Sequence, residues 1–152
     1  MTLKTVLLAV GPGDAERTDE LAETVIEVAK PAGTTVVLGH VFTRDEYDDV
    51  LDRLDFDPDH EAVDPNDVAG RHATIRDLAS TLEKADVSYL VRGAVGEHGE
   101  TIVNLAEDVD ADRVIVGGRK RSPTGKAVFG STAQEVLLSS PCPVTFVRAE
   151  SE

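Results

Sequence analysis

Short apolar runs alternate along this chain with longer segments whose apolar residues recur every three or four positions. The runs are rich in Val, Leu and Ile without polar alternation, which is typical of strands buried on both faces. We predict strands at residues 3–10, 34–41, 88–95, 113–116 and 144–147, and helices at residues 14–32, 66–85, 100–109 and 131–140. The pair Gly117 and Gly118 is predicted to break the fourth strand.

This order of elements predicts the fold class. Strands that alternate with helices favour an α/β fold with an open parallel five-stranded sheet and helices on both faces. The length of 152 residues and the hydrophobic content of 41% suit a single domain over residues 1–152. In such sheets ligands bind outside the carboxyl ends of the strands, where the strand order reverses.

An acidic segment between the second strand and the next helix interrupts the alternation. Residues 45–67 hold eleven acids and one base, Arg53, and we treat about 43–65 as an acidic insertion. Helical spacing of Tyr47, Val50, Leu51 and Leu54 predicts a short acidic helix, followed by a loop over residues 55–65. Such carboxylates could bind divalent cations, but their spacing matches no calcium loop, so a solvated acidic surface is favoured.

The net charge of −14 comes from 29 acids and 15 bases, with more Asp than Glu and more Arg than Lys. The mean field would repel phosphate backbones, so we expect no nucleic-acid partner. An Asp-rich, Lys-poor composition with few aromatic residues favours adaptation to high salt, where screening weakens self-repulsion, and we expect a halophilic archaeal source. An ordinary acidic cytosolic protein is the alternative.

The ends of the chain and its cysteine content indicate a compartment. Residues 1–10 carry one lysine and an apolar run that is too short to span a membrane, and they lack a small-residue cleavage pattern. A lone cysteine, Cys142, excludes an internal disulfide and a cysteine metal cluster. We therefore expect a cytoplasmic protein that does not insert into membranes.

One basic stretch stands out against the acidic background. Residues 113–134 contain five bases and no acid: Arg113, Arg119, Lys120, Arg121 and Lys126. The same stretch contains a glycine loop that leads into a helix beginning with Gly130-Ser131-Thr132, where free backbone N–H groups and the helix dipole favour an anion. We therefore predict a phosphate-binding site here.

Several glycine and small-residue positions form a pattern with the apolar strands. They are Gly96, Ile102, Ala106, Ala111, Asp112, Val114 to Gly117, Gly130 to Leu137 and Pro141 to Val144, together with the strand end Gly39-His40-Val41. In this pattern the chain resembles the universal stress protein A family. The resemblance implies an adenine nucleotide α-hydrolase-like, Rossmann-like fold, and a bound ATP or related adenine nucleotide, with Mg²⁺ as a possible companion.

The phosphate loop of nucleotide-binding members reads Gly-x2-Gly-x9-Gly-Ser/Thr. Gly117, Gly130 and Ser131 match that pattern, whereas Lys120 replaces the second glycine. Gly11 stands where such members tend to have an aspartate, and Asp14 follows three residues later. These departures favour altered or absent ATP binding, while the basic loop favours a phosphorylated ligand, so both alternatives stay open.

The resemblance implies a set of nucleotide-binding residues. They are Ala9, Val10, Gly11, Val41, Val116, Gly117, Arg119, Lys120, Gly130, Ser131 and Thr132, with adenine expected against Ala9, Val10 and Val41. We expect the protein to bind a nucleotide and to act in the stress response by conformation or assembly. The alternative is a member without nucleotide that acts as a dimeric interaction protein. In either case a homodimer is expected through the C-terminal strand from Val144 to Val147, which the resemblance places at a sheet edge.

Residues that could support catalysis do not assemble in the sequence. The histidines lack i, i+4 spacing, so no zinc site is indicated. We interpret His40 as a packed structural residue, His98 as loop or capping chemistry, and Cys142 as inert. An ATP-dependent α-hydrolase-type enzyme is disfavoured because Gly11-Pro12-Gly13-Asp14 is not the loop that such enzymes carry. We therefore expect no enzyme, beyond slow incidental ATP hydrolysis.

Overall fold

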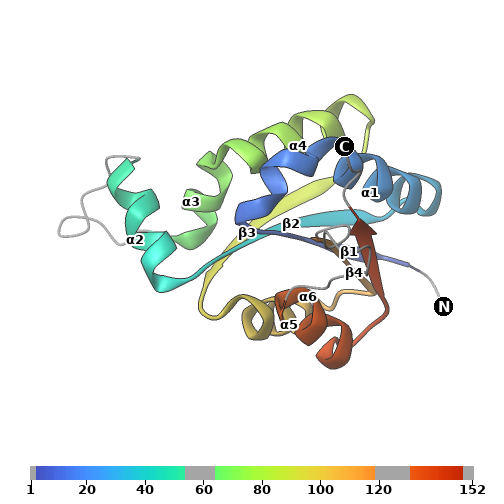
Figure 1. Cartoon of the computed structure of the whole chain (residues 1–152). Coiled ribbons are helices and arrows are strands. Elements are labelled where there is room, and N and C mark those ends of the chain that lie inside the picture. Colours follow the sequence, from blue (N-terminus) through green and yellow to red (C-terminus); the bar gives the residue numbers. More distant parts are fainter. Residues whose placement is uncertain (1–2, 54–63, 119–130, 149–152) are drawn as a thin grey trace, which may run out of the picture.

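The computed structural model describes residues 3–53, 64–118 and 131–148. Its centre is a five-stranded sheet in the order β3-β2-β1-β4-β5 (Figure 1). The strands are β1 (Thr5–Val10), β2 (Thr35–Phe42), β3 (Tyr89–Val95), β4 (Arg113–Gly118) and β5 (Val144–Arg148). All four strand pairs are parallel, so the predicted open parallel α/β sheet is confirmed.

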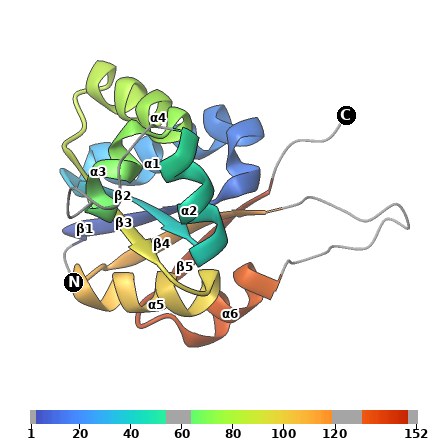
Figure 2. The same ribbon diagram turned by 90° about the vertical axis from the view of Figure 1, so that its left-hand side faces the viewer.

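Helices cover both faces of the sheet (Figures 1 and 2). Helices α1 (Thr18–Ala32) and α4 (Ala73–Lys84) pack on one face, and α5 (His98–Asp108) and α6 (Ser131–Ser139) on the other. The buried side chains that join helices to strands include Leu21, Ile75 and Leu8 on the first face and Leu105, Val136 and Leu7 on the second. Because both faces are covered, successive strand residues are apolar rather than alternating.

The strand order reverses beside β1. The chain passes from β1 through β2 to β3, and then returns to place β4 on the other side of β1. The register pairs Ala9 of β1 with Val116 of β4, so Gly11 and Gly117 follow at the same edge of the sheet. The carboxyl ends of β1 and β4 therefore form the switch point at which sheets of this type bind ligands.

One predicted helix is two helices in the structure. Residues 66–85 divide into α3 (Pro65–Arg71) and α4, separated by His72 in an extended conformation. The His72 Nδ1 atom accepts a 3.3 Å hydrogen bond from Thr74 N and so caps the start of α4. The helical spacing of apolar residues continues across this break, which is why the pattern predicted one element.

Two other boundaries differ from the prediction. The glycines Gly117 and Gly118 do not break β4, because they pair in register with Val147 and Arg148 of β5. The helix predicted from residue 14 is instead preceded by a 3-10 helix, η1 (Pro12–Arg17), in which Pro12 stands at the first turn. This short turn places Asp14 and Arg17 beside the end of β1 before α1 begins.

The predicted acidic helix is present as α2 (Arg44–Arg53), with Tyr47, Val50 and Leu51 buried on its inner side. Residues 54–63 lie outside the described part of the chain, so the acidic loop predicted there is not tested. Across the described residues, no helix combines the length and the apolar character needed to cross a membrane.

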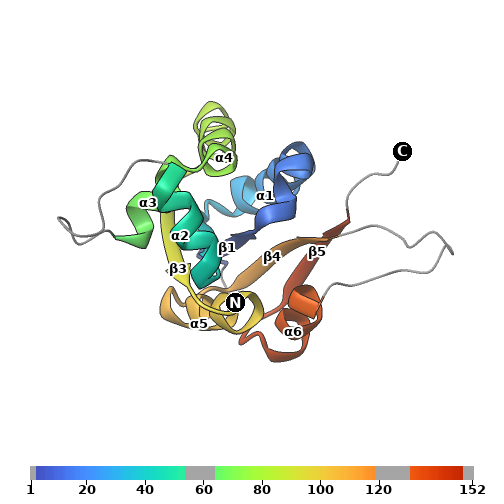
Figure 3. The same cartoon turned by 60° about the vertical axis from the view of Figure 1, so that its left-hand side comes forward.

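The two edges of the sheet differ in what lies beside them (Figure 3). Along β3, helix α3 lies so close that a side chain on Gly93 would collide with the Pro65 carbonyl, and the Gly93 N–H donates to Asn66 Oδ1 at 2.7 Å. At the other edge, β5 pairs with β4 and with no second strand among the described residues. The outer backbone of β5 is thus the edge that another chain could extend.

Candidate functional site: the crevice at the ends of β1 and β4

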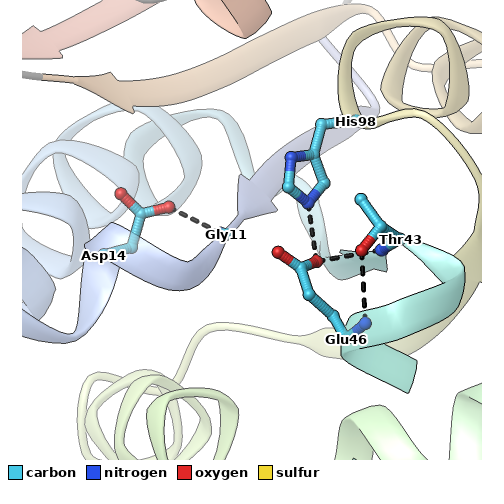
Figure 4. Close-up of polar contacts among 5 residues, drawn as sticks. All are labelled: Gly11, Asp14, Thr43, Glu46 and His98. Atoms are coloured by element: carbon cyan, nitrogen blue, oxygen red, sulfur yellow. Dashed lines mark hydrogen bonds and ion pairs between the residues drawn. The ribbon is translucent and has the colours of Figure 1, made fainter. Parts of the chain in front are cut away.

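The crevice is the site around Gly11, Asp14, Arg17 and Gly117 at the carboxyl ends of β1 and β4, and Asp14 is its central side chain. It is only 6% exposed, and both of its carboxylate oxygens accept hydrogen bonds. Oδ2 accepts a 2.7 Å hydrogen bond from Gly11 N, and Oδ1 lies 2.6 Å from the Nε atom of Arg17 (Figure 4 shows the first contact). The 3-10 turn explains this geometry, because it returns the side chain of residue 14 to the backbone at the end of β1.

Gly117, at the end of β4, lies directly against Asp14 and Arg17. A β-carbon at this position would lie 2.9 Å from both Arg17 Cδ and Asp14 Oδ1, and 3.0 Å from Arg17 Nε. The ion pair between Asp14 and Arg17 therefore lies directly on the glycine. The space that a side chain would fill is occupied by the Asp14 carboxylate and by the Cδ and Nε atoms of Arg17. A guanidinium is a group that binds anions such as phosphate.

The residues expected near adenine do not form one wall. Ala9 and Val41 belong to the core on the α5 side of the sheet, whereas Val10 packs on the α1 and α4 side. All three are buried, with 5%, 1% and 2% exposure respectively. Val116 shares the face of Ala9 and Val41, so these three side chains line one side of the strand ends.

The remaining predicted phosphate residues divide between described and undescribed parts of the chain. Helix α6 begins at Ser131, as predicted, and Thr132 is half-buried. Arg119, Lys120 and Gly130 lie outside the described residues. Arg121 and Lys126 of the basic stretch also lie outside them, whereas Arg113 begins β4 and thus stands at the amino end of the sheet, away from the crevice.

A second polar cluster lies at the carboxyl ends of β2 and β3 (Figure 4). Thr43 and Glu46 form a capping box at the start of α2, with Thr43 N donating to Glu46 Oε1 at 2.9 Å and Glu46 N donating to Thr43 Oγ1 at 3.2 Å. The Nε2 atom of His98 lies 2.8 Å from the same Oε1. Partial burial opposes ionisation of Glu46, but the hydrogen bonds from Thr43 and His98 outweigh it and lower its pKa.

His98 differs from its predicted place. It is the first residue of α5 rather than part of a loop before residue 100, and its ring bridges to α2. The capping role that we expected belongs to the Thr43–Glu46 pair, which His98 supports through its contact with the carboxylate. His98 thus connects two helices at the ligand edge of the sheet.

His40 is a packed core residue, as predicted. It is 3% exposed, and its ring lies 4.2 Å from that of Phe42 and 4.4 Å from that of His72, measured between ring centroids. A small cavity of about 130 Å³ adjoins these three rings and is bordered by α2. Burial, reinforced by His72, lowers the pKa of His40 to about 3, so its imidazole is neutral at ordinary pH.

Other candidate chemistry is sparse in the described residues. Within residues 3–53, 64–118 and 131–148, no three His, Cys, Asp or Glu side chains are grouped so that they could hold a metal ion. Cys142 is half-buried, and its backbone N–H donates to Ser140 Oγ at 3.3 Å. The strongest polar arrangement that adjoins the switch point is therefore the Asp14–Arg17 pair.

Sequence reasoning missed two of these contacts. Thr43-x-x-Glu46 is a capping-box pattern that could have been recognised from its spacing. The i, i+3 spacing of Asp14 and Arg17 could also have suggested an ion pair. No local signal, however, shows that Arg17 lies on Gly117, because the two residues meet only through the sheet.

Comparison with known proteins places these features in a family. The family model described as "Universal stress protein family" matches residues 2–148. A universal stress protein of Mycolicibacterium smegmatis is 33% identical over 79 residues, which are 51% of this chain and 61% of that protein. That alignment thus covers less than two thirds of the relative's length.

Solved structures show the same fold over nearly the whole chain. A universal stress protein from Archaeoglobus fulgidus is 25% identical with a TM-score of 0.69, covering 97% of this chain and 99% of that one. The universal stress protein from Archaeoglobus fulgidus in complex with dAMP is 20% identical with a TM-score of 0.64, covering 97% and 99%. With the family model matched from residue 2 to residue 148, the chain belongs to the universal stress protein family.

Proposed function

We propose that this protein binds an adenine nucleotide in the crevice at the ends of β1 and β4 and acts by conformation or assembly rather than as an enzyme. The observation that carries the proposal is the glycine at the switch point, where the space that a Gly117 side chain would fill holds the Asp14–Arg17 ion pair. The dAMP complex of the similar Archaeoglobus fulgidus protein supports an adenine nucleotide as the ligand class.

In this proposal the phosphates lie along Gly117 and the start of α6. Ser131 and Thr132 open that helix, whose free N–H groups favour an anion. Gly130, Arg119 and Lys120 complete the phosphate site on the basis of the sequence. The purine lies against the strand ends at Ala9 and Val41, with Val10 contributing backbone rather than the same apolar face. If ATP is the nucleotide, Mg²⁺ arrives with its phosphates.

Gly11 stands where nucleotide-binding family members tend to have an aspartate, and in the structure Asp14 brings a carboxylate to the same place. The carboxylate of Asp14 returns to Gly11 N, so a carboxylate lies near the end of β1 although residue 11 itself is glycine. The end of β1 therefore has a carboxylate nearby, although that carboxylate comes from η1 rather than from residue 11. Lys120 is proposed as a phosphate-binding cation on the basis of its charge and its position in the pattern.

The proposal is tested by titrating the purified full chain with ATP, AMP and guanosine monophosphate in a calorimeter, after mass spectrometry of any ligand released on denaturation. We expect saturable binding of an adenine nucleotide and weaker binding of the guanine nucleotide. A folded protein that releases no nucleotide and binds none of the three at millimolar concentration would contradict the proposal.

A second candidate function is that of a dimeric interaction protein, favoured by the edge strand β5. Its outer backbone has no partner strand among the described residues, and antiparallel pairing with a second copy about a two-fold axis would satisfy those groups. We therefore propose a homodimer through Val144 to Val147. This role does not require a nucleotide, and it can coexist with one.

Thr145→Pro tests the dimer, since proline removes a backbone N–H from the ladder. We expect light scattering at high salt, where charge repulsion is screened, to give a dimer for the wild type and a monomer or unstable protein for the variant. Leu138→Ser is a matched control, because Leu138 is 78% exposed on α6 and lies outside the strand. A wild-type chain that stays monomeric at micromolar concentration would refute this assembly.

The composition supports two broader proposals. The net charge of −14 and the Asp-rich composition favour a protein adapted to high salt. We also propose a cytoplasmic location, in keeping with a chain that carries a single cysteine. Thermal unfolding measured across a range of potassium chloride tests the first of these, since stability should rise steeply with salt.

A further inference from the structure

The crevice already contains an anion and a cation that bind each other. The side chains of Arg17 and Asp14 are 13% and 8% exposed, so the pair is largely removed from water. The Gly11 N–H holds the carboxylate at 2.7 Å, and the Arg17 Nε holds it at 2.6 Å. A backbone donor and a guanidinium, the two elements of a phosphate site, are thus engaged by a carboxylate of the chain itself.

Gly117 makes this arrangement relevant to a ligand. The Arg17 side chain lies on the glycine at which the family pattern places phosphate, and it is contributed by the turn before α1 rather than by the phosphate loop. Arginine presents several donors in a planar fork, which suits the oxygens of a phosphate. Arg17 is therefore a cation within the crevice that the loop pattern does not include.

Charge decides whether a ligand can replace the carboxylate. A phosphomonoester carries about −1.5 to −2 charges near neutral pH, whereas a carboxylate carries one. A phosphomonoester therefore competes for a guanidinium more strongly than Asp14 does. A cyclic phosphodiester, with a single charge, has no such advantage, and a nucleoside has no group with which to compete.

We propose that Arg17 recognises the phosphate of a phosphomonoester nucleotide such as AMP, and that Asp14 is the internal competitor which this phosphate displaces. The inference rests on the proposed nucleotide function and adds to it a recognition residue and a preference. The site selects phosphomonoesters over nucleosides and cyclic phosphodiesters because only the former exceed the charge of Asp14. Gly117 is required because any side chain there would exclude both partners from the same space.

Calorimetric titration with AMP, cyclic AMP and adenosine tests the proposal on the full chain. Arg17→Gln removes the guanidinium, and Asp14→Asn removes the competing charge while its amide oxygen can still accept from Gly11 N. Lys30→Gln is the control for Arg17, because Lys30 is exposed near the far end of α1, roughly 20 Å away at 1.5 Å per residue. Glu27→Gln, exposed on the same helix, is the control for Asp14.

For the wild type we expect AMP to bind on the order of tenfold more tightly than adenosine, as one charge-assisted contact allows. Arg17→Gln should lower AMP affinity on the order of tenfold and change adenosine affinity by less than about twofold. Asp14→Asn should raise the affinity for AMP, and it should raise the affinity for cyclic AMP more strongly. The preference of the protein for AMP over cyclic AMP should therefore become smaller. Both controls should behave as the wild type.

Two outcomes separate this inference from the proposed function. If AMP binds but Arg17→Gln weakens AMP and adenosine equally, or a folded Asp14→Asn protein binds AMP more weakly, the inference is overturned while nucleotide binding stands. If no nucleotide binds to the wild type or to Asp14→Asn, both fail together.

A measurement on the wild type avoids dependence on the folding of a variant. The ¹⁵N resonance of Arg17 Nε should shift when AMP is added, because its partner changes from a carboxylate to a phosphate, and should stay in place with adenosine. An unchanged resonance at saturating AMP would overturn the inference by itself.

Discussion

Two groups of side chains, an ion pair and a cluster of rings, differ in what fills the space around them. At the ends of β1 and β4, Asp14 and Arg17 lie on Gly117, so the contacts are ionic and the floor has no side chain. At the end of β2, the rings of His40, Phe42 and His72 pack together, with centroids 4.2 to 6.4 Å apart. The first arrangement can exchange partners, whereas the second is part of the core.

The two groups also differ in charge, since His40 is neutral and Asp14 is paired with Arg17. The neutral His40 ring packs against the rings of Phe42 and His72, and its Nδ1 atom has no hydrogen-bond partner among the described residues. The Asp14 carboxylate is as buried as many core residues but has two donors. Burial of a titratable group therefore does not by itself indicate a binding site; a binding site also needs donors that a ligand can take over.

The largest effect is expected from Gly117→Val. The side chain would meet Arg17 and Asp14 at about 2.9 Å and exclude a ligand from the same space. If the phosphate loses two charge-assisted contacts of about 1.5 kcal/mol each, nucleotide affinity should fall on the order of 100-fold. Valine is compatible with a strand, so circular dichroism should show an intact fold.

Gly70→Val is the matched control. A side chain at Gly70 on α3 would meet no atom within 4 Å, so nucleotide affinity should stay unchanged. Equal affinities for the wild type and a folded Gly117→Val protein would show that the crevice does not hold the ligand.

His40→Leu tests the cluster of rings by its effect on stability at low pH. In the folded protein the pKa of His40 is about 3, while in the unfolded chain it returns to about 6.5. Protons bind to the unfolded state first, so the free energy of unfolding should fall as pH drops below about 6.5. Between pH 7 and pH 5 this residue should account for a loss of about 2 kcal/mol, at about 1.4 kcal/mol per pH unit.

Urea unfolding of the wild type and of His40→Leu at both pH values measures that difference. Between pH 7 and pH 5, the free energy of unfolding of the variant should fall by about 2 kcal/mol less than that of the wild type. The pH dependence of nucleotide affinity should be the same for the two proteins. Parallel pH dependence of the two proteins would show that His40 is not held neutral by the fold.

The smallest effect is expected from Glu46→Gln, which removes the charge from the contact with His98. The two side chains are 35% and 23% exposed, so solvent screens the pair, and the stability loss should stay below about 1 kcal/mol. The ratio of AMP to adenosine affinity should remain that of the wild type. A change in that ratio would mean that the phosphate lies at the second cluster rather than at the crevice.

The sequence predicted those parts of the fold that depend on local pattern. Runs of Val, Leu and Ile located all five strands, because strands that are buried on both faces are continuously apolar in sequence. The break at His72 was not predictable, since Val68 and Ile75 keep helical spacing across it. It is set by the position of α3 against β3, where Asn66 bonds to Gly93.

The candidate site shows the same division. Gly117 and Ser131 could be recognised from a glycine pattern because the phosphate loop is a contiguous segment. Arg17 could not, because its contact with Gly117 joins residues one hundred positions apart through the pairing of β1 with β4. Contacts of that kind depend on the assembled sheet rather than on the neighbouring sequence.

The most direct test of the central claim is a crystal structure of the protein with AMP. We predict the phosphate within hydrogen-bond distance of the Arg17 guanidinium and beside Gly117, the purine against the ends of β1 and β2, and the Asp14 carboxylate no longer on Arg17 Nε. A nucleotide bound elsewhere, or one whose phosphate leaves the Asp14–Arg17 pair intact, would contradict the account.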